Sequence, residues 1–157
     1  MTKPESSAQL LKHMATINRL NVKAFTAKTR QELIFIILNS TIHALRYDRA
    51  VLWGMESARP KLLGVSGQSD LNKDADIAKQ WQSLVMGLVD PNKAHVVDAD
   101  SIVGESALWK KYRTSNEGTF IWLPIFHEND LVLGMWIEIF GKTASSETLE
   151  ETLHFIT

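Results

Sequence analysis

Residues 119–140 read TFIWLPIFHENDLVLGMWIEIF, two apolar runs joined by the polar segment His127-Glu-Asn-Asp130. Apolar runs that flank a short polar break in this way predict a β-hairpin. Asn129 and Asp130 tolerate the positive φ angles that a tight turn requires, so they are the expected turn residues. We therefore expect two long antiparallel strands at the centre of the fold.

Pairing the strands about this turn assigns each residue to one of two sheet faces. One face is predicted to be wholly apolar and to pack against helices, and it holds Phe120, Trp122, Pro124, Phe126, Leu131, Leu133, Met135, Ile137 and Ile139. The other face is interrupted by a glycine, an indole and a carboxylate, and it holds Ile121, Leu123, Ile125, His127, Val132, Gly134, Trp136 and Glu138. The second face is the one expected to line a cavity.

The rest of the chain adds helices and shorter strands. Apolar side chains at helical spacing predict helices at about residues 5–25, 29–45 and 73–88. Thr29 and Glu32 form a capping-box pattern at the second helix, and Asn72 is the expected cap of the third. Short β-rich runs predict strands at 50–55, 60–65 and 94–97, and a helical turn is expected at 106–112.

This order of elements describes an α+β layout with an antiparallel sheet. It resembles a GAF domain, a fold related to PAS, over most of the chain. The resemblance is carried by YDRAVLW at 47–53, LLGVSG at 62–67 and, above all, LPI at 123–125 followed by LGMWI at 133–137. It implies terminal helices on one face of the sheet and a ligand pocket on the other, roofed by residues 69–117.

The resemblance also implies a sensory or regulatory domain of the kind used in signal transduction, usually dimeric through its terminal helices. YDR at 47–49, VSG at 65–67 and NEGT at 116–119 are further similar to GAF domains at the N-terminal, cytoplasmic end of some bacterial HlyD-type membrane-fusion adaptors of secretion and efflux systems. In such a protein, a membrane helix and further parts would follow this chain.

We expect a single GAF-like domain over residues 1–157, with an N-terminal helix at 1–28, a core at 29–140 and the start of a C-terminal helix at 141–157. At this length a folded chain buries roughly 70% of its unfolded surface, which is enough for a hydrophobic core. Leu149, Leu153 and Ile156 begin an amphipathic pattern that runs to the last residue without a helix terminator. We therefore expect this chain to be a piece of a longer protein.

Composition excludes several functional classes. The chain has no Cys, which excludes a disulfide framework, a thiolate-ligated metal, a catalytic thiol and a thioether-linked chromophore. Lys+Arg 17 against Asp+Glu 18 gives a net charge of −1, so no global field attracts nucleic acid or an anionic membrane. No apolar run approaches the roughly 18 residues of a spanning helix, so we expect a cytoplasmic domain that meets a membrane only through regions beyond this chain.

The candidate ligand-binding residues are four aromatic residues and one carboxylate, namely Trp53, Trp109, Tyr112, Trp136 and Glu138. On the mixed sheet face, an aromatic wall and one acceptor would orient a small ligand. The segment WKKYR at 109–113 would offer basic and aromatic groups to an anionic ligand. The alternative is structural: Trp109 and Tyr112 point into the core, Trp136 packs there too, and Glu138 forms an edge salt bridge.

Two functions are favoured by the sequence, and a small enzyme is the third, less favoured alternative, because no activated nucleophile, metal set or carboxylate pair can be assembled from these residues. In the first, the domain senses a small molecule in its pocket and forms a homodimer. In the second, it is a dimerisation module whose pocket is filled by its own side chains. An open cavity would favour the first, and Trp136 packed under the segment of Trp109 would favour the second. No cofactor and no nucleic-acid partner are expected.

Overall fold

The computed structural model describes residues 4–43, 46–68, 72–103 and 106–141. The chain divides into two compact units, Met1–Arg46 and Tyr47–Thr157. The first unit holds helix α1 (Pro4–Thr26), helix α2 (Arg30–Ser40) and a short 3-10 helix η1 (Thr41–His43), and α1 contacts α2. The predicted Thr29 cap of α2 is confirmed, because its side chain accepts a 3.0 Å hydrogen bond from the backbone N–H of Glu32. The return bond of the predicted capping box differs, because the Glu32 carboxylate accepts the backbone N–H of Lys28 at 2.9 Å.

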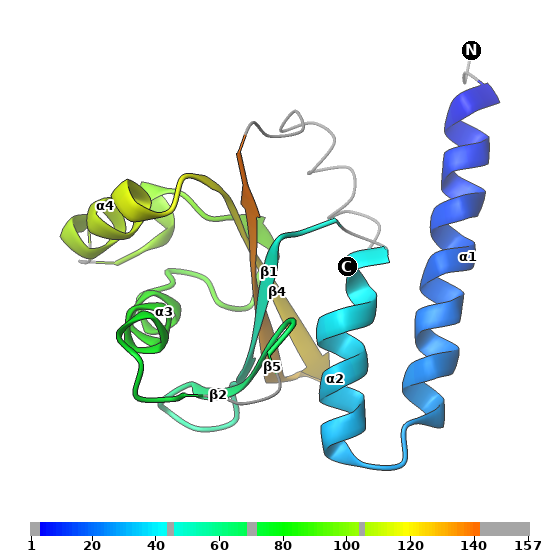
Figure 1. The fold of residues 1–157 in the computed structure, drawn as a ribbon, viewed down its shortest axis with the longest axis horizontal. Coiled ribbons are helices and arrows are strands. Elements are labelled where there is room, and N and C mark those ends of the chain that lie inside the picture. The colour runs from blue at the N-terminus through cyan, green and yellow to red at the C-terminus, as the bar shows by residue number, and fades with distance from the viewer. Residues whose placement is uncertain (1–3, 44–45, 69–71, 104–105, 142–157) are drawn as a thin grey trace. The chain divides into compact units, whose positions relative to one another are not determined.

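The second unit is built on a five-stranded antiparallel sheet (Figure 1). Its strands are β1 (Arg49–Gly54), β2 (Lys61–Val65), β3 (His95–Val96), β4 (Gly118–His127) and β5 (Asp130–Phe140). They lie in the order β2-β1-β5-β4-β3, so β5 hydrogen-bonds to β1 on one side and to β4 on the other. The predicted α+β class with an antiparallel sheet is confirmed.

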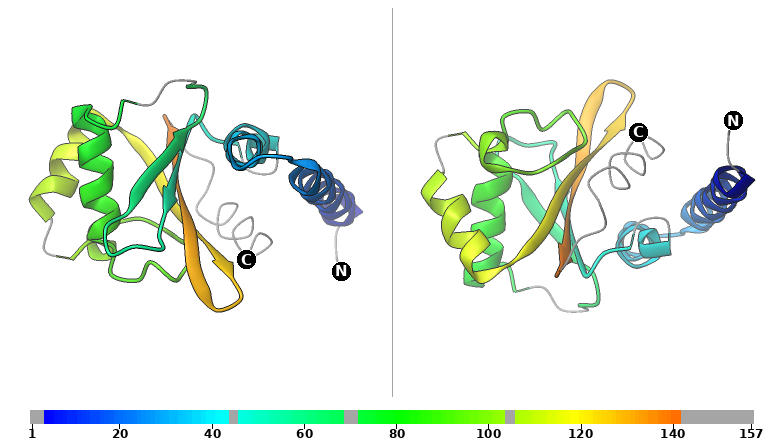
Figure 2. Two further views of the ribbon diagram at one scale, coloured as in Figure 1. Left: turned by 90° about the horizontal axis from the view of Figure 1, so that it is seen from below. Right: turned by 90° about the horizontal axis from the view of Figure 1, so that it is seen from above.

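Helices α3 (Asp76–Met86) and α4 (Ser106–Ser115) lie side by side over one face of this sheet (Figures 1 and 2). The prediction that Asn72 caps α3 is wrong. Its side chain accepts the N–H of Asp74 in a turn before the helix, and the N-cap residue is Ala75, which makes no side-chain cap. The local Asx turn competes successfully for the amide side chain. A short 3-10 helix η2 (Ala99–Ser101) precedes α4. In the part of the chain that the structure describes, no helix is both long and apolar enough to cross a membrane.

The turn between β4 and β5 lies where the sequence places it, since His127 pairs with Asp130. The sequence predicts the positive φ angle at Asn129 and Asp130, but the structure places it one residue earlier in the turn. Glu128 is the residue with a positive φ, at 55°. The turn therefore places a glutamate in the left-handed region, a cost that the long flanking ladder of β4 and β5 outweighs.

A β-bulge next to this turn overturns the predicted sheet faces. Ile125 pairs with Leu133 and Phe126 with Leu131, which leaves Val132 as an extra residue in β5. Because side chains alternate along a strand, a register shift of one exchanges the faces of every residue beyond it. The sequence predicts that Phe120 and Trp122 lie on the face opposite Trp136 and Glu138. In the structure all four side chains share one face, where Phe120 pairs with Glu138 and Trp122 with Trp136.

The shared face lies under α3 and α4 and carries the largest buried side chains of the unit, among them Trp53, Trp122, Trp136 and Phe120. The buried residues of the opposite face are apolar, namely Ala50, Leu52, Ile121, Leu123, Met135 and Ile137. The packing of the terminal helices against the sheet stays a prediction. Residues 142–157, which include the expected start of the C-terminal helix with Leu149, Leu153 and Ile156, lie outside the described residues.

Gly134 makes room for an indole in the core of this layer. It lies in the middle strand, paired with Trp53 of β1 and with Pro124 of β4. A Cβ atom built at Gly134 would overlap the six-membered ring of Trp122. The glycine is therefore required by a close approach within the core.

We expect Gly134→Ala to lower the free energy of unfolding by roughly 2–3 kcal/mol, because the indole of Trp122 must move in a packed core. Gly54→Ala is the matched control, since a Cβ there would meet Leu63 at an ordinary 3.6 Å. Urea denaturation of both variants measures the difference, and an equal loss of stability in the two would contradict the close approach.

Candidate functional site

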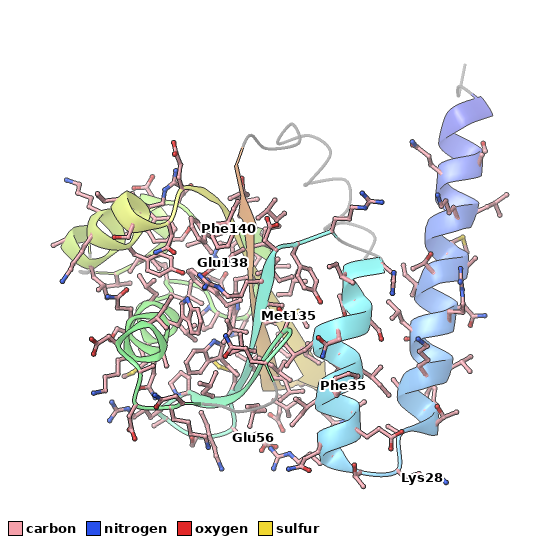
Figure 3. The ribbon with its side chains drawn as sticks, viewed as in Figure 1. Lys28, Phe35, Glu56, Met135, Glu138 and Phe140 are labelled. Carbon is pink, nitrogen blue, oxygen red and sulfur yellow. The ribbon has the colours of Figure 1, made fainter. Side chains whose placement is uncertain are left out.

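The side chain of Glu138 is fully buried in the second unit. It lies on β5 and faces the layer formed by α3 and α4 (Figure 3). Burying an unpaired carboxylate costs several kcal/mol, so the partners of Glu138 decide whether the unit folds in this form.

The charge of Glu138 is neutralised by Arg49 of the neighbouring strand β1. The two residues are paired in the β1–β5 register. One carboxylate oxygen, Oε2, accepts hydrogen bonds from Arg49 Nε at 3.0 Å and Arg49 Nη2 at 2.5 Å. The guanidinium also stacks over the rings of Trp81 at 4.8 Å and Phe140 at 5.2 Å. Arg49 is thus held by both charge and aromatic contact.

The other carboxylate oxygen, Oε1, accepts three hydrogen bonds from aromatic side chains. Trp81 Nε1 of α3 donates to it at 2.9 Å, Trp136 Nε1 of β5 donates at 3.0 Å, and the hydroxyl of Tyr112 from α4 donates as well. Trp81 Nε1 also lies 2.7 Å from the Tyr112 hydroxyl. A single buried carboxylate therefore joins α3, α4 and the middle strand. We call these five residues, Arg49, Trp81, Tyr112, Trp136 and Glu138, the Glu138 cluster.

Aromatic rings close the space around the Glu138 cluster. Trp109 meets Phe120 edge to face at 5.5 Å between ring centroids and Trp136 at 6.4 Å. Tyr112 meets the same two rings at 5.5 and 6.5 Å. Edge-to-face contacts of this kind are the favoured geometry for packed aromatic side chains. Trp109 and Tyr112 are 4% and 1% exposed, so the prediction that they point into the core is confirmed.

Four of the five residues predicted to bind a ligand, Trp109, Tyr112, Trp136 and Glu138, come together in this way. The fifth, Trp53, is buried in the same core but makes no hydrogen bond to the carboxylate. Sequence reasoning missed the contribution of Arg49 and of the Trp81 indole N–H. Arg49 lies 89 residues from Glu138, and only the pairing of β1 with β5 brings them together.

Tyr112 is held in its protonated form. Burial is the main cause, and the negative charge of Glu138 beside it adds to the effect, so the pKa of Tyr112 is raised well above its ordinary value near 10. The phenol therefore remains a hydrogen-bond donor throughout the neutral range. Within the described ranges, no three His, Asp or Glu side chains are grouped as a metal site would require.

Comparison with known proteins identifies the fold. No protein-family model matches the sequence, and no curated protein matches it. Among solved structures, the GAF domain of a phosphoenolpyruvate-protein phosphotransferase from Coxiella burnetii is 13% identical, with a TM-score of 0.62 over 93% of this chain and 88% of that chain. The GAF domain of the Acinetobacter phosphoenolpyruvate-protein phosphotransferase is also 13% identical, with a TM-score of 0.60 over 91% of this chain and 86% of that chain.

The phycoerythrobilin-bound GAF domain of a cyanobacterial phytochrome is similar to the same degree, at 12% identity and a TM-score of 0.59 over 93% of this chain and 91% of that chain. At these identities the likeness concerns the fold. The α+β unit with its five-stranded antiparallel sheet therefore has the fold of GAF domains. The predicted context of an HlyD-type adaptor finds no support in these likenesses.

The raised pKa of Tyr112 predicts an alkaline loss of stability. Tyrosine in the unfolded chain ionises near pH 10, whereas folded Tyr112 keeps its proton to higher pH. The contribution of the protonated Tyr112 phenol to the free energy of unfolding is therefore fully present below about pH 10. It is lost as the pH rises from there toward the pKa of folded Tyr112. Relative to Tyr112→Phe, the wild type should lose about 1.4 kcal/mol of unfolding free energy per pH unit above 10.

Urea denaturation between pH 8 and pH 11 tests this difference. Phe120→Leu serves as the control, because it disturbs the same ring contacts without removing a titratable group. Its difference from the wild type should stay constant with pH. A constant difference for Tyr112→Phe as well would show that the phenol is not held protonated by folding.

Proposed function

We propose that this protein is a regulatory domain of the GAF fold that carries out no catalysis and joins two chains through helix α1. The observation that carries the proposal is the closed interior between the sheet and helices α3 and α4. There Trp136 packs edge to face under Trp109, and the Trp136 side chain is 0% exposed. This arrangement favours a module whose interior is filled by its own side chains over a sensor that binds a small molecule at that place.

The state of the buried carboxylate supports a role without catalysis. Oε2 of Glu138 accepts two hydrogen bonds from Arg49, and Oε1 accepts three from Trp81, Tyr112 and Trp136. A carboxylate has about four lone-pair sites, so all of them are occupied here. Glu138 has no acceptor site left for a substrate proton, which a general base needs. The Glu138 cluster therefore has a structural role, in which it holds α3 and α4 against the sheet.

Helix α1 supports the proposed assembly because it has two apolar sides. At 3.6 residues per turn, its half-buried residues Ile17, Leu20 and Ala24 share one side. A second apolar stripe covers an arc of about 80° around the helix axis, and its centre lies roughly 130° around the axis from the centre of the half-buried side. It consists of Leu11, Met14, Val22 and Phe25, which are 68%, 59%, 56% and 90% exposed. We call these four residues the α1 stripe.

A second copy of this chain is the partner that fits the α1 stripe. Leu11, Asn18 and Phe25 are spaced by seven residues, and Met14 lies three residues after Leu11, as in the seam of a helical coiled coil. Asn18 falls within the stripe, and a single polar residue in such a seam fixes the register of two paired helices. A stripe that is self-complementary in this way suits a twofold contact between identical helices.

Other parts of the sequence-based hypothesis stay predictions. They are the cytoplasmic location, the longer protein to which this domain would belong, and its role in a bacterial HlyD-type adaptor. The proposed assembly is compatible with that setting, because pairing through α1 would bring two copies of the second unit into one complex.

We expect the wild-type chain to be dimeric and Met14→Glu combined with Phe25→Glu to be monomeric, because a charge buried in the seam would be unpaired. The circular dichroism of the variant should be unchanged, since both side chains are exposed. Native mass spectrometry and light scattering measure the oligomeric state.

Lys23→Glu is the matched control, because it introduces the same side chain at an exposed position of α1 outside the α1 stripe. It should remain dimeric. A monomeric wild type, or an equal weakening by Lys23→Glu, would contradict the proposed pairing.

A further inference from the structure

A surface pocket of about 350 Å³ lies beside the β1–β2 hairpin and α3. Trp53 belongs to its lining, together with Arg59, Lys61, Lys73 and Gln82. No member of the Glu138 cluster lines it. The pocket is large enough for a small metabolite and is separate from the closed interior.

All the charged side chains that line this pocket are positively charged. Three of its lining residues, Arg59, Lys61 and Lys73, are cationic, and its lining contains no Asp or Glu. Arg49 with Glu138 is the ion pair found among the described residues, so none of the three pocket cations has a described carboxylate within 4 Å. Guanidinium and ammonium groups that line one pocket without a carboxylate favour an oxyanion.

Trp53 brings an indole ring to the lining of the pocket. Its side chain is buried, and Trp53 Nε1 is the one buried side-chain nitrogen or oxygen in the described part of the chain that has no hydrogen-bond partner. In contrast, the indole N–H of Trp122 donates to the carbonyl of Pro91 at 2.8 Å. A buried donor without an acceptor costs about 1–3 kcal/mol. Because Trp53 Nε1 is shielded from solvent, Trp53 meets a ligand in the pocket through its ring.

Hydrogen bonds hold the basic side of the pocket in place. Gln82 Nε2 donates to the carbonyl of Pro60 at 2.7 Å, and Arg59 Nη2 donates to Gln82 Oε1 at 3.3 Å. The hydroxyl of Ser57 donates to the carbonyl of Arg59 at 2.8 Å. Arg59 is thereby positioned before any ligand arrives and keeps donors to spare, which lowers the entropic cost of binding.

We propose that this pocket binds a small phosphate-bearing compound. The phosphate group lies among Arg59, Lys61 and Lys73, and the rest of the ligand lies against the indole ring of Trp53, which belongs to the pocket lining. Binding at this edge of the sheet would give the domain a regulatory ligand site apart from its filled interior. The site goes beyond the proposed assembly role and does not depend on it, because no residue of α1 lines the pocket.

The test is a nitrogen-15 NMR titration of the full chain with inorganic phosphate and with glycerol 3-phosphate, at constant ionic strength. The five Trp residues give separate indole N–H signals, and Trp53→Phe assigns the one of interest. We expect the Trp53 signal to move with saturation while the signals of Trp81 and Trp136 stay in place. Glycerol 3-phosphate should bind more tightly than phosphate, because the pocket exceeds the size of the phosphate group.

Arg59→Gln and Lys61→Gln should each weaken binding by about fivefold, since each removes one charged partner of the phosphate. Lys79→Gln, an exposed lysine of α3 outside the pocket, should leave the affinity unchanged. Arg59 and Lys61 are both exposed, so we expect both variants to fold and to keep the dispersed NMR spectrum of the wild type. The proposal is overturned if the Trp53 signal does not move, if chloride moves it equally, or if Lys79→Gln weakens binding as much as Lys61→Gln.

Discussion

The burial of one carboxylate, that of Glu138, constrains the whole second unit. A charge in this position is tolerated only when every acceptor site is satisfied, because the desolvation cost is several kcal/mol. Arg49 meets this need from β1, and Trp81 and Tyr112 meet it from α3 and α4. The two helices are therefore tied to the sheet through hydrogen bonds that require a defined distance and direction, in addition to apolar packing that requires neither.

These hydrogen bonds accompany a filled interior between the sheet and helices α3 and α4. A GAF domain of similar fold, from a cyanobacterial phytochrome, is bound to phycoerythrobilin. In this chain, Trp109, Trp136 and Phe120 pack against each other next to the carboxylate. The proposed functions therefore lie outside this interior, at the α1 stripe and at the basic pocket beside Trp53.

Sequence reasoning found the strands and the helices, because alternation and helical spacing are local signals. Four of its five candidate residues, Trp109, Tyr112, Trp136 and Glu138, lie together in the closed interior. It placed Phe120 and Trp122 on the wrong face because a single extra residue, Val132, reverses the alternation, and no local signal marks a bulge. The role of Arg49 was missed for a related reason, since its partner lies in a strand that is distant in sequence. Strand pairing, which determines both features, is set by tertiary packing.

The central claim is that the interior is closed around Glu138, and hydrogen exchange of the indole N–H groups tests it most directly. The indole protons of Trp81 and Trp136 both point at Glu138 Oε1. In deuterated buffer, we expect both to exchange only through global unfolding, at the rate of the slowest backbone amides of β5. Exchange of either proton in the folded chain, faster than those amides by orders of magnitude, would show an open interior and contradict the account.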